Sequence, residues 1–593
     1  MSPDSNLYLL HRLWHHLKPR RRVQFGLLLV LMIFASITEV LSIGAVLPFL
    51  GVLTAPDRVF SHPIAQHFIH RLGISSSDQL LLPLTMAFAA AALLAGCTRL
   101  LLLWASMRLS YAVGADLSYK IYQHTLYQPY AVHVGRNSSE VIAGISTKIG
   151  VVIKILMEVL IFFSSTMLLV SILFALLAID PFVALTAMSG FSCIYFFIIW
   201  VTRHRVKSNS HRIARNSSQV IKALQEGLGG IRDVLIDGSQ ATYCQIYRSA
   251  DLPLRKAQGS NSFISSSPRT GVEALSMVLI AALAYTLSKD AVGFGKAIPL
   301  LGALALGAQR LLPAMQQAYA AWMSLRGEHA SLKDAVDLLN QPLPDDVYQS
   351  PPMPIVFTQK ITLKQAGFRY SSQSPWIFQN LDLTVVKGSR VGFIGATGSG
   401  KSTLLDIVMS LLALTEGTLE VDGQVITRAN QRAWQTRIAH VPQAIFLADS
   451  SIAENIAFGV AKEKIDYARV RLVAKQAQIS VAIESWPQQY NTFVGERGIR
   501  LSGGQRQRIG IARALYKKAD VIIFDEATSA LDNDTEDAVM QAIDSLSKDL
   551  TILIIAHRLS TLDNCQYIIE LAQGQTSCKP ATSVKRQPQD ITQ

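Results

Sequence analysis

The chain has 593 residues, of which 50% are apolar and only 16% are charged. Soluble domains usually carry about 25% charged residues, so this composition excludes a disordered or fibrous protein and disfavours a purely soluble enzyme. The five cysteines lie far apart, with no CxxC pair, so neither a disulfide scaffold nor a cysteine-built zinc site is expected.

The net charge of +13 is distributed unevenly. Residues 1–340 hold 29 Lys and Arg against 17 Asp and Glu, whereas residues 341–593 hold 26 against 25. The excess therefore lies in the apolar half, where it flanks long apolar runs as the cytoplasmic loops of membrane proteins do. A nucleic-acid-binding protein would not place its basic residues there, so no nucleic-acid partner is expected.

Six membrane spans are predicted in the first half. A basic segment of 22 residues precedes an apolar run over residues 25–55, which holds one charge, Glu39. A secretory signal peptide is the alternative, but its apolar region has about 7–15 residues, and a span needs about 20. The basic flank places the N-terminus in the cytoplasm. The other predicted spans are residues 79–98, 159–179, 181–202, 274–288 and 297–325, and the ends of the last two are ambiguous.

The loops between these runs differ in length and character. Residues 104–154 and 203–269 are long, polar and basic, which suits helices that continue from the membrane into the cytoplasm. Residues 54–78 lie outside and carry apolar residues four apart. They predict either an amphipathic external helix or an ordinary loop helix packed on its own protein. These apolar residues are Phe60, Ile64, Phe68 and Leu72.

A proline-rich linker separates the apolar half from a second domain. From residue 355 the pattern changes to short β-rich runs, glycine turns and helices, which is typical of a soluble α/β domain. The predicted fold is thus multidomain, with an all-α domain of six transmembrane helices followed by an α/β domain. The predicted segments are 1–22 (cytoplasmic N-terminal segment), 23–340 (transmembrane domain), 341–354 (linker), 355–574 (α/β domain) and 575–593 (polar C-terminal tail).

Residues 391–408 carry a phosphate-binding motif. They read VGFIGATGSGKSTLLDIV, in which an apolar strand enters a glycine-rich loop that is followed by an apolar helix. The strand before and the helix after are the context that this motif requires. Glycines let backbone N–H groups curl around phosphate oxygens, and the helix N-terminus adds a favourable dipole. We expect Lys401 to reach the β- and γ-phosphates and Ser402 to ligate Mg²⁺.

About 120 residues further on, four apolar residues of a predicted buried strand precede Asp525 and Glu526. An acid at the end of such a strand, beside the phosphate loop, can hold Mg²⁺, and the next acid can polarise an attacking water. An ordinary strand end with surface acids is the alternative, and the phosphate loop disfavours it.

Residues 501–505 read LSGGQ, which matches the signature sequence of ATP-binding cassette (ABC) proteins. The chain therefore resembles this specific family. Gln443 in VPQ, residues 529–532 (SALD), His557 in AHRLS and residues 495–498 (GERG) follow the family's order. Six spans before one such domain resemble an ABC exporter half-transporter, and the resemblance covers almost the whole chain.

The resemblance implies ATP and Mg²⁺ as cofactors and a role for each motif residue. Glu526, His557, Lys401 and Gln443 are the implied catalytic residues, with Glu526 as general base or orienting group for the water. Ser402, Gln443 and Asp525 are the implied Mg²⁺ ligands. Tyr370 offers a flat face for adenine. The remaining implied nucleotide-binding residues are Gly395, Ala396, Thr397, Gly398, Ser399, Gly400, Thr403, Ser502, Gly503, Gly504 and Gln505.

A second chain is also implied, because signature residues in this family close on the nucleotide of another domain. One chain carries one phosphate loop and one signature, so a homodimer with two competent sites is expected. In similar exporters two short cytoplasmic helices couple the ATP-binding domains to the membrane helices. The candidates here lie near residues 127–130 and 229–233.

The cargo is predicted from charges in the spans, which are costly unless they face a cavity or a partner. Glu39, Arg99, Glu158, Glu273 and Arg310 are the candidates. Arg99, Glu158 and Glu273 lie near helix ends, where they can instead snorkel to the interface. Arginine suits phosphate or carboxylate groups, which favours an anionic, lipid-linked amphiphile. Residues 39–49 (EVLSIGAVLPF) resemble bacterial flippases of lipid-linked oligosaccharides.

The leading hypothesis is therefore an ATP-driven exporter or flippase in a bacterial inner or plasma membrane, acting on a lipid-linked saccharide or other amphiphile. An exporter of peptides or hydrophobic small molecules is the second hypothesis. A non-transporting ABC channel or regulatory ATPase is the third.

Overall fold

The structure is a computed structural model that describes residues 5–54, 56–61, 66, 76–179, 181–289, 294–344, 353–526, 533–544, 549–555, 562, 564–572 and 574–580. The chain divides into two compact units, which are described separately. The first comprises Met1–Gln128 and Gly135–Leu343, and the second comprises Pro129–Val134 and Pro344–Gln593.

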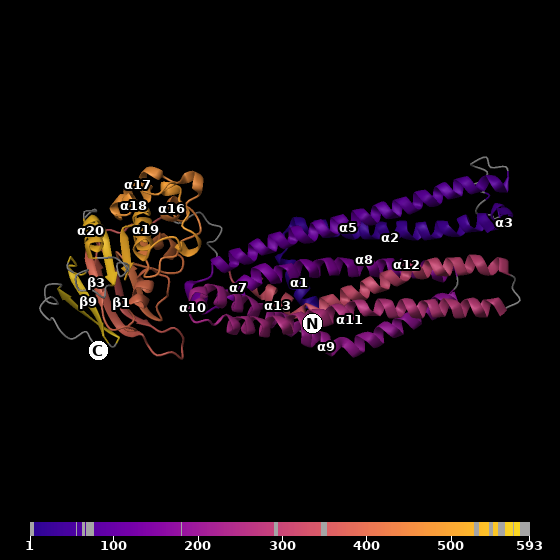
Figure 1. The fold of residues 1–593 in the computed structure, drawn as a ribbon, viewed down its shortest axis with the longest axis horizontal. Helices are drawn as coiled ribbons and strands as arrows, with labels where there is room; N and C mark the ends of the chain where they lie inside the picture. Colours follow the sequence, from indigo (N-terminus) through magenta and orange to yellow (C-terminus); the bar gives the residue numbers. More distant parts are fainter. Residues whose placement is uncertain are drawn as a thin grey trace. The chain divides into compact units, whose positions relative to one another are not determined.

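The first unit is entirely helical among its described residues. Figure 1 shows its long helices running side by side. The elements are α1 (Asn6–His16), α2 (Pro19–Thr54), α3 (Pro56–Phe60), η1 (Ser77–Leu80), α5 (Leu81–Leu126), α7 (Ser138–Ala143), η2 (Gly144–Lys148), α8 (Ile149–Ile179), α9 (Pro181–Gly229), α10 (Ile231–Ile236), α11 (Gln240–Lys289), α12 (Phe294–Gly327) and α13 (His329–Leu339).

Each predicted apolar run lies almost entirely within one long helix, and α5, α9 and α11 extend well beyond their runs. In the described part of the chain, three helical stretches are long and apolar enough to cross a membrane: 19–53, 81–126 and 138–174. The runs in α9, α11 and α12 include residues whose side chains lie outside the description, so the count of six spans stays a prediction. Most of the predicted external helix, residues 54–78, also lies outside the described residues.

The N-terminal helix α1 is held by an amphipathic face. The Ser5 side chain caps it by accepting a hydrogen bond from the Tyr8 backbone N–H. Leu9 and Leu13, one turn apart, are buried in a cluster that includes Leu332 and Leu339 of α13. The helix that enters the membrane domain and the helix that leaves it therefore share one hydrophobic core.

The second unit contains two sheets and one short helix from the first half of the sequence, α6 (Tyr130–Val134). The smaller sheet is antiparallel, in the order β2 (Phe378–Val386), β1 (Lys360–Phe368), β4 (Glu416–Val421), β5 (Gln424–Val425). The larger has the order β10 (Gln575–Pro580), β9 (Tyr567–Ala572), β3 (Arg390–Ile394), β8 (Thr551–Ile555), β7 (Val521–Asp525), β6 (Ile438–Val441).

Helices pack around these sheets. They are α14 (Lys401–Val408), α15 (Gln431–Gln435), α16 (Ile452–Ile456), α17 (Tyr467–Gln476), α18 (Ser480–Glu484), α19 (Gly503–Tyr516) and α20 (Asn533–Asp544), with 3-10 turns η4 (Lys462–Lys464), η5 (Gln489–Asn491) and η6 (Glu496–Gly498). Figure 1 shows α16, α17, α18 and α19 gathered together in this unit.

The larger sheet is buried on both faces, which explains its continuously apolar strands. On β7, Val521 and Ile523 belong to one hydrophobic cluster, whereas Ile522 and Phe524 belong to another. Successive strand residues point to opposite faces, so both clusters contact the sheet. Strands β9, β3, β8, β7 and β6 are parallel, and parallel sheets need this two-sided cover.

The C-terminal end of the domain differs from the expectation. The first six residues of the expected polar tail, 575–580, form β10, which pairs antiparallel with β9. The backbone groups of the β9 edge provide hydrogen-bond partners that a polar composition does not reveal. Residues 581–593 lie outside the described part.

Asp422 stabilises the smaller sheet by tying strand β4 to the start of β1. Its carboxylate accepts hydrogen bonds from the backbone N–H groups of Gln359 (2.8 Å) and Lys360 (2.7 Å) and from the hydroxyl of Thr358 (2.8 Å). Burial opposes its ionisation, but these hydrogen bonds outweigh burial and hold the pKa of its carboxyl below the usual value.

We predict that Asp422→Asn lowers the free energy of unfolding at pH 7 by about 1 kcal/mol, since the site is partly solvent-accessible. A depressed pKa contributes stability above the unfolded value of about 3.9, and this stability is lost as the pH falls through the folded value. Thermal unfolding of the whole protein should show a wild-type advantage at pH 7 that shrinks at acid pH. Asp382→Asn is the control, because Asp382 accepts one backbone hydrogen bond, from Gln365. Equal effects of both variants would contradict this account.

Candidate nucleotide-binding site

The predicted site residues meet at the carboxyl edge of the larger sheet. Strand β3 leads into the phosphate loop, β7 ends at Asp525, and β6 leads toward Gln443. Because parallel strands end at the same edge, these three segments from distant parts of the chain share one region. Strand β8 lies between β3 and β7, so the phosphate loop and the two acids flank its end.

The phosphate loop occupies residues 395–400, and α14 begins at Lys401. The backbone of Gly400 is left-handed, with φ +97. The Lys401 side chain is 7% exposed, and its ammonium donates hydrogen bonds to the carbonyls of Gly395 (2.7 Å) and Ala396 (3.0 Å). The buried Ser399 hydroxyl has no hydrogen-bond partner among the described residues. The start of the phosphate loop thus binds the Lys401 ammonium through its backbone carbonyls.

Gly395 is required by close approach as well as by its φ of +151. A Cβ at this position would lie 2.4 Å from the Leu571 carbonyl oxygen of β9, which is backbone and cannot turn away. We predict that Gly395→Ala lowers the thermal unfolding midpoint of the protein more than Gly398→Ala does. The control is matched because Gly398 also has a positive φ, +82, but has open space around it. Equal midpoints for the two variants would contradict this prediction.

Ser402 and Asp525 bring two side-chain oxygen atoms close together beside the loop. The Ser402 Oγ donates toward Asp525 Oδ1 at 3.5 Å. Burial and the neighbouring charge of Glu526 raise the pKa of the Asp525 carboxyl, while Ser402 and Lys401 oppose this shift. A hydroxyl and a carboxylate that has a second carboxylate beside it fit Mg²⁺, which prefers oxygen ligands. The residues present therefore fit the metal that was expected from the sequence.

Glu526 and Gln443 form a second pair. The Gln443 Nε2 donates to Glu526 Oε2 at 2.6 Å. Glu526 has a left-handed backbone, with φ +50, and its N–H donates to the Ile555 carbonyl at 3.1 Å. The end of β8 therefore holds the backbone at Glu526 and turns it away from the strand direction of β7.

Two side chains add features that the motifs do not reveal. The exposed Tyr370 donates or accepts a hydrogen bond with the Thr403 Oγ1 at 3.1 Å, which ties the expected adenine platform to α14. Asp406, one turn further along α14, was not singled out from the sequence. Burial, followed by the charge of Asp525, raises the pKa of Asp406 to about 6. The sequence feature that could have identified Asp406 is an acidic residue within the apolar helix that follows the phosphate loop.

The signature residues lie apart from the phosphate loop. Ser502 caps α19, accepting from the Gln505 N–H at 3.2 Å, and the Gln505 side chain accepts from the Ser502 N–H at 2.9 Å. In the part of the chain that the structure describes, the signature residues 502–505 make no hydrogen bond to residues 395–403. His557 and residues 529–532 lie outside the described residues.

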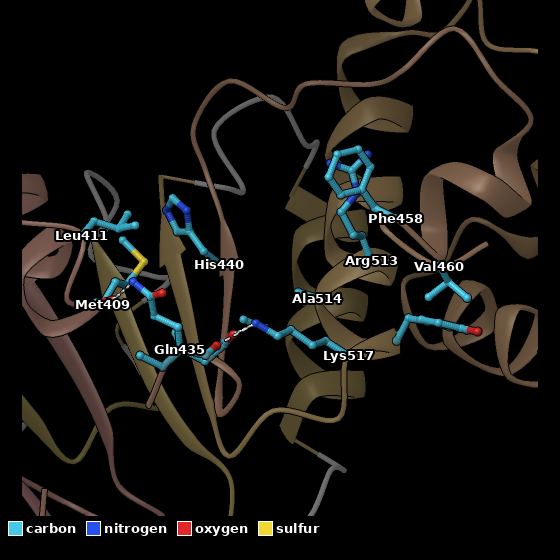
Figure 2. Close-up of a pocket in the computed structure, with 12 residues that line it drawn as sticks. Met409, Leu411, Gln435, His440, Phe458, Val460, Arg513, Ala514 and Lys517 are labelled. Carbon is cyan, nitrogen blue, oxygen red and sulfur yellow. Dashed lines mark hydrogen bonds between the residues drawn. The ribbon is translucent and has the colours of Figure 1, made fainter. Parts of the chain in front are cut away.

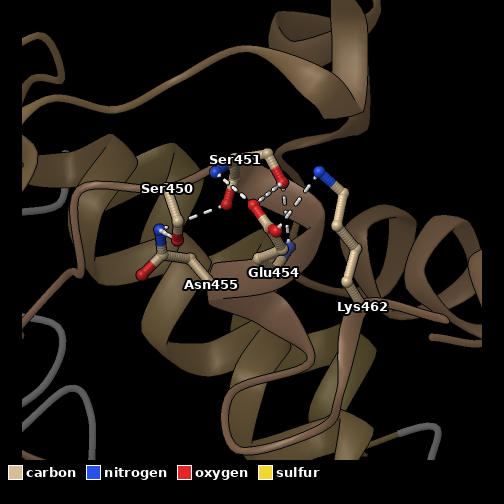
Figure 3. A network of polar contacts seen from close by, with 5 residues as sticks. All are labelled: Ser450, Ser451, Glu454, Asn455 and Lys462. Carbon is tan, nitrogen blue, oxygen red and sulfur yellow. Dashed lines mark hydrogen bonds and ion pairs between the residues drawn. The ribbon is translucent and has the colours of Figure 1, made fainter. Parts of the chain in front are cut away.

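A polar network fixes the segment that follows Gln443 (Figure 3). Ser451 and Glu454 form a reciprocal capping box at the start of α16. Asn455 accepts from the Ala448 N–H at 3.0 Å and donates to the Ala448 carbonyl at 2.9 Å. Lys462 lies 3.7 Å from Glu454. These contacts anchor the loop between Gln443 and the helical part of the domain.

A groove of about 590 Å³ lies between β6 and α19 (Figure 2). Arg513 stacks on Phe458, with 4.6 Å from the guanidinium carbon to the ring centroid, and donates to the carbonyls of Asn455 and Phe446, each at 2.9 Å. Lys517 donates to the Gln435 carbonyl at 2.8 Å. Burial lowers the pKa of Arg513 to about 10 and lowers that of Lys517. The groove adjoins the strand that leads to Gln443, outside the phosphate loop.

The candidate cargo residues occupy different environments. Glu39 is 5% exposed and lies on α2 among other buried polar residues, including Thr38, whose hydroxyl is 2.9 Å from that of Thr98. Arg99 is exposed on α5. Arg310 belongs to α12, but its side chain lies outside the described residues. Of these residues, the structure therefore describes the side chains of Glu39, which is buried, and Arg99, which is exposed.

Comparisons with known proteins agree with this architecture. The family of the ABC transporter transmembrane region matches residues 24–306, and the ABC transporter family matches residues 378–529. The chain therefore belongs to the ABC transporters and has the half-transporter architecture, one membrane region followed by one nucleotide-binding domain. It is a multi-pass membrane protein with a cytoplasmic nucleotide-binding domain. The predicted family, fold class and nucleotide binding are confirmed.

Three individual matches show how far the likeness extends. An ATP-dependent lipid A-core flippase of Cupriavidus metallidurans is 40% identical over 218 residues, 37% of each chain. A flippase of the same description from Chromohalobacter salexigens is 29% identical over 66% of each chain. The structure of a bacterial Atm1-family ABC exporter with ATP bound shares the fold, with a TM-score of 0.76, 23% identity, and coverage of 95% of this chain and 97% of that one.

Proposed function

We propose that this protein is an ATP-driven transporter that exports or flips a lipid-linked saccharide or other anionic amphiphile across a bacterial inner membrane. The observation that carries the proposal is the convergence of the Ser402–Asp525 and Gln443–Glu526 pairs at the sheet edge beside the phosphate loop. The same chain has apolar helices long enough to span a membrane. This combination suits a protein that couples ATP hydrolysis to movement of a substrate across the membrane.

In the proposed mechanism the chain's own residues position ATP and one water. The phosphate loop cradles the phosphates, and Lys401 exchanges its two carbonyl partners for phosphate oxygens. The Glu526 carboxylate accepts a proton from the water as its oxygen bonds to the γ-phosphorus, and the bond from that phosphorus to the β–γ bridging oxygen breaks, giving ADP and phosphate. Gln443 holds the Glu526 carboxylate in place.

The remaining assignments follow the motifs. Ser402, Asp525 and Gln443 would hold Mg²⁺, which supplies positive charge that stabilises the phosphate oxygens. Tyr370 stacks on adenine, and His557 contacts the γ-phosphate. The signature residues Ser502 and Gly504 have no hydrogen bond to their own phosphate loop among the described residues, which favours their use by a second copy of the chain. We therefore propose a homodimer with two hydrolytic sites.

The substrate class rests on chemistry and on the relatives. The relatives from Cupriavidus metallidurans and Chromohalobacter salexigens are each named as an ATP-dependent lipid A-core flippase. The first of these matches spans 37% of the relative's length. Glu39 places a carboxylate in the interior of the helical unit, where charged groups usually serve a pathway or a partner. Arg310 remains our candidate for contacting an anionic group of the cargo.

The test is ATP hydrolysis by the purified protein in lipid nanodiscs with added amphiphiles. The panel comprises polyprenyl-diphosphate sugars, lipopolysaccharide precursors, neutral phospholipids and hydrophobic peptides. Stimulation by the anionic saccharide lipids, reduced in Arg310→Ala, is the expected result. Stimulation by peptides or neutral compounds alone would replace the proposed substrate class, and folded protein without any hydrolysis would contradict the transporter proposal.

A further inference from the structure

Helix α9 carries a one-signed set of charges at the end of its apolar run. No acidic residue occurs over residues 181–225. Over residues 203–215, five Arg or Lys side chains and two histidines are exposed, and together they are called the α9 basic face. Its members are Arg203, His204, Arg205, Lys207, His211, Arg212 and Arg215.

The opposite side of this helix segment is locked into the helical unit. Val206 and Ile213 are buried in two hydrophobic clusters. The Asn209 side chain donates to that of Asn261 on α11 at 2.9 Å. The Ser210 hydroxyl accepts from the Ala330 N–H of α13 at 3.0 Å. The helix therefore cannot rotate to hide its basic residues, and their outward direction is set by packing.

Several other basic residues of this unit form ion pairs. Arg21, Lys148 and Lys154 form ion pairs with Asp116, Asp334 and Glu328, respectively. On α11, Arg255 and Arg269 pair with acids four residues away. No member of the α9 basic face forms an ion pair with any residue that the structure describes. Its charge is therefore left for a group outside this chain.

An exposed aromatic band lies directly before the basic residues. Phe197 and Trp200 are 62% and 55% exposed, and their ring centroids are 6.4 Å apart. With 100° per residue, these two side chains share the outward side of α9 with His204, Lys207, His211 and Arg215, and Arg205 and Arg212 lie on the flank of that side. Exposed aromatic rings followed by basic residues are typical of the membrane–water boundary on the cytoplasmic side. Residues 200–203 thus mark the level of that boundary on α9.

The distance from this boundary decides which residues an anionic membrane surface attracts. Residues 203–207 lie within about 6 Å of helix rise from the boundary, and Arg215 lies about 18 Å from Arg203. The screening length at physiological ionic strength is about 8 Å. Arg205 and Lys207 therefore feel the surface charge strongly, whereas Arg212 and Arg215 feel less of it.

We propose that the α9 basic face, with the aromatic band below it, binds the headgroups of anionic phospholipids in the cytoplasmic leaflet. The apolar rings contact the acyl chains, and the cations contact the phosphate-bearing headgroups. This site acts from the bilayer and does not depend on the identity of the cargo. A juxtamembrane Lys or Arg near such a surface contributes about fivefold to lipid preference.

Trp200 provides a local reporter for this site. The full-length protein is reconstituted in phosphatidylcholine nanodiscs that contain either brominated phosphatidylglycerol or the same fraction of brominated phosphatidylcholine. Bromine quenches nearby tryptophan fluorescence. The chain has seven tryptophans, so the contribution of Trp200 is obtained as the difference from the Trp200→Phe variant. Titration of the brominated fraction then measures the preference for the anionic lipid at this position.

The matched variants each remove two positive charges from exposed positions. We expect the wild type to prefer phosphatidylglycerol by about fivefold or more and to lose that preference in 1 M salt. R205Q/K207Q should abolish most of the preference, and R212Q/R215Q should reduce it less. The control R248Q/K256Q, on the cytoplasmic part of α11 and far from its apolar run, should leave it unchanged.

Three outcomes would overturn the proposal. Equal quenching by both lipids in the wild type would make the α9 basic face an ordinary solvated surface. A preference that survives in R205Q/K207Q would place its origin elsewhere. A Trp200 that neither lipid quenches would show that a second copy of the chain covers this face. Elution as a single folded species on size-exclusion chromatography qualifies each variant for the measurement.

Discussion

Glu526→Gln is expected to reduce ATP turnover by at least about 100-fold while ATP binding is retained. The change keeps the size of the side chain and its ability to accept from Gln443, whose Nε2 lies 2.6 Å from the carboxylate. It removes the group that accepts the proton of the attacking water, and general-base catalysis contributes about 10²–10⁴-fold. Steady-state phosphate release and equilibrium binding of a fluorescent ATP analogue measure the two quantities.

Measuring ATP binding as well as turnover separates a role of Glu526 in hydrolysis from a role in binding ATP. If Glu526 serves hydrolysis alone, the variant should hold ATP longer and accumulate in the closed, nucleotide-bound dimer. Glu463→Gln is the control, because Glu463 is an exposed carboxylate in the 3-10 turn η4 of the same domain. Hydrolysis by Glu526→Gln at the wild-type rate would exclude Glu526 as the base.

Lys401→Ala is expected to weaken ATP binding itself, by about tenfold or more, and to lower turnover by about 100-fold. The ammonium is buried and already held at 2.7 Å and 3.0 Å by the carbonyls of Gly395 and Ala396. It is therefore positioned at the loop before any phosphate arrives. Truncation removes both the charge that attracts phosphate and the contacts that close the loop.

The contrast between the two variants separates binding from chemistry. Titration with the ATP analogue should show the affinity loss for Lys401→Ala and not for Glu526→Gln. Lys464→Ala is the matched control, since Lys464 is an exposed lysine of the same domain. Unchanged affinity in Lys401→Ala would mean that the lysine does not contact the phosphates.

Local sequence was sufficient for the elements of the site. The phosphate loop, the apolar strand before Asp525 and the signature at the start of α19 could all be placed from residue patterns, because backbone chemistry restricts where glycines and capping residues occur. Each apolar run likewise fell almost entirely within one long helix. Short helices occur where the coupling helices were expected, α6 at residues 130–134 and α10 at residues 231–236, and their coupling role stays a prediction.

Other features could not be predicted, because they depend on contacts between distant segments. Asp406 acquires its raised pKa from burial and from Asp525, more than 100 residues away. The strand β10 forms because β9 offers an unpaired edge, although residues 575–580 look like a polar tail. Gly395 is needed because the Leu571 carbonyl passes close to it. None of these neighbours is visible in the local sequence.

The family, the two-part architecture and the nucleotide chemistry thus follow from the chain as a string of residues, since hydropathy, glycine spacing and motif order are local properties. Tertiary structure alone decided which side chains meet. It paired Gln443 with Glu526 and Ser402 with Asp525, buried Glu39, and left the basic side of α9 without a partner among the described residues. The physical reason is that packing fixes which face of each strand and helix is buried, and only the remaining faces are available for ligands, lipids or a second chain.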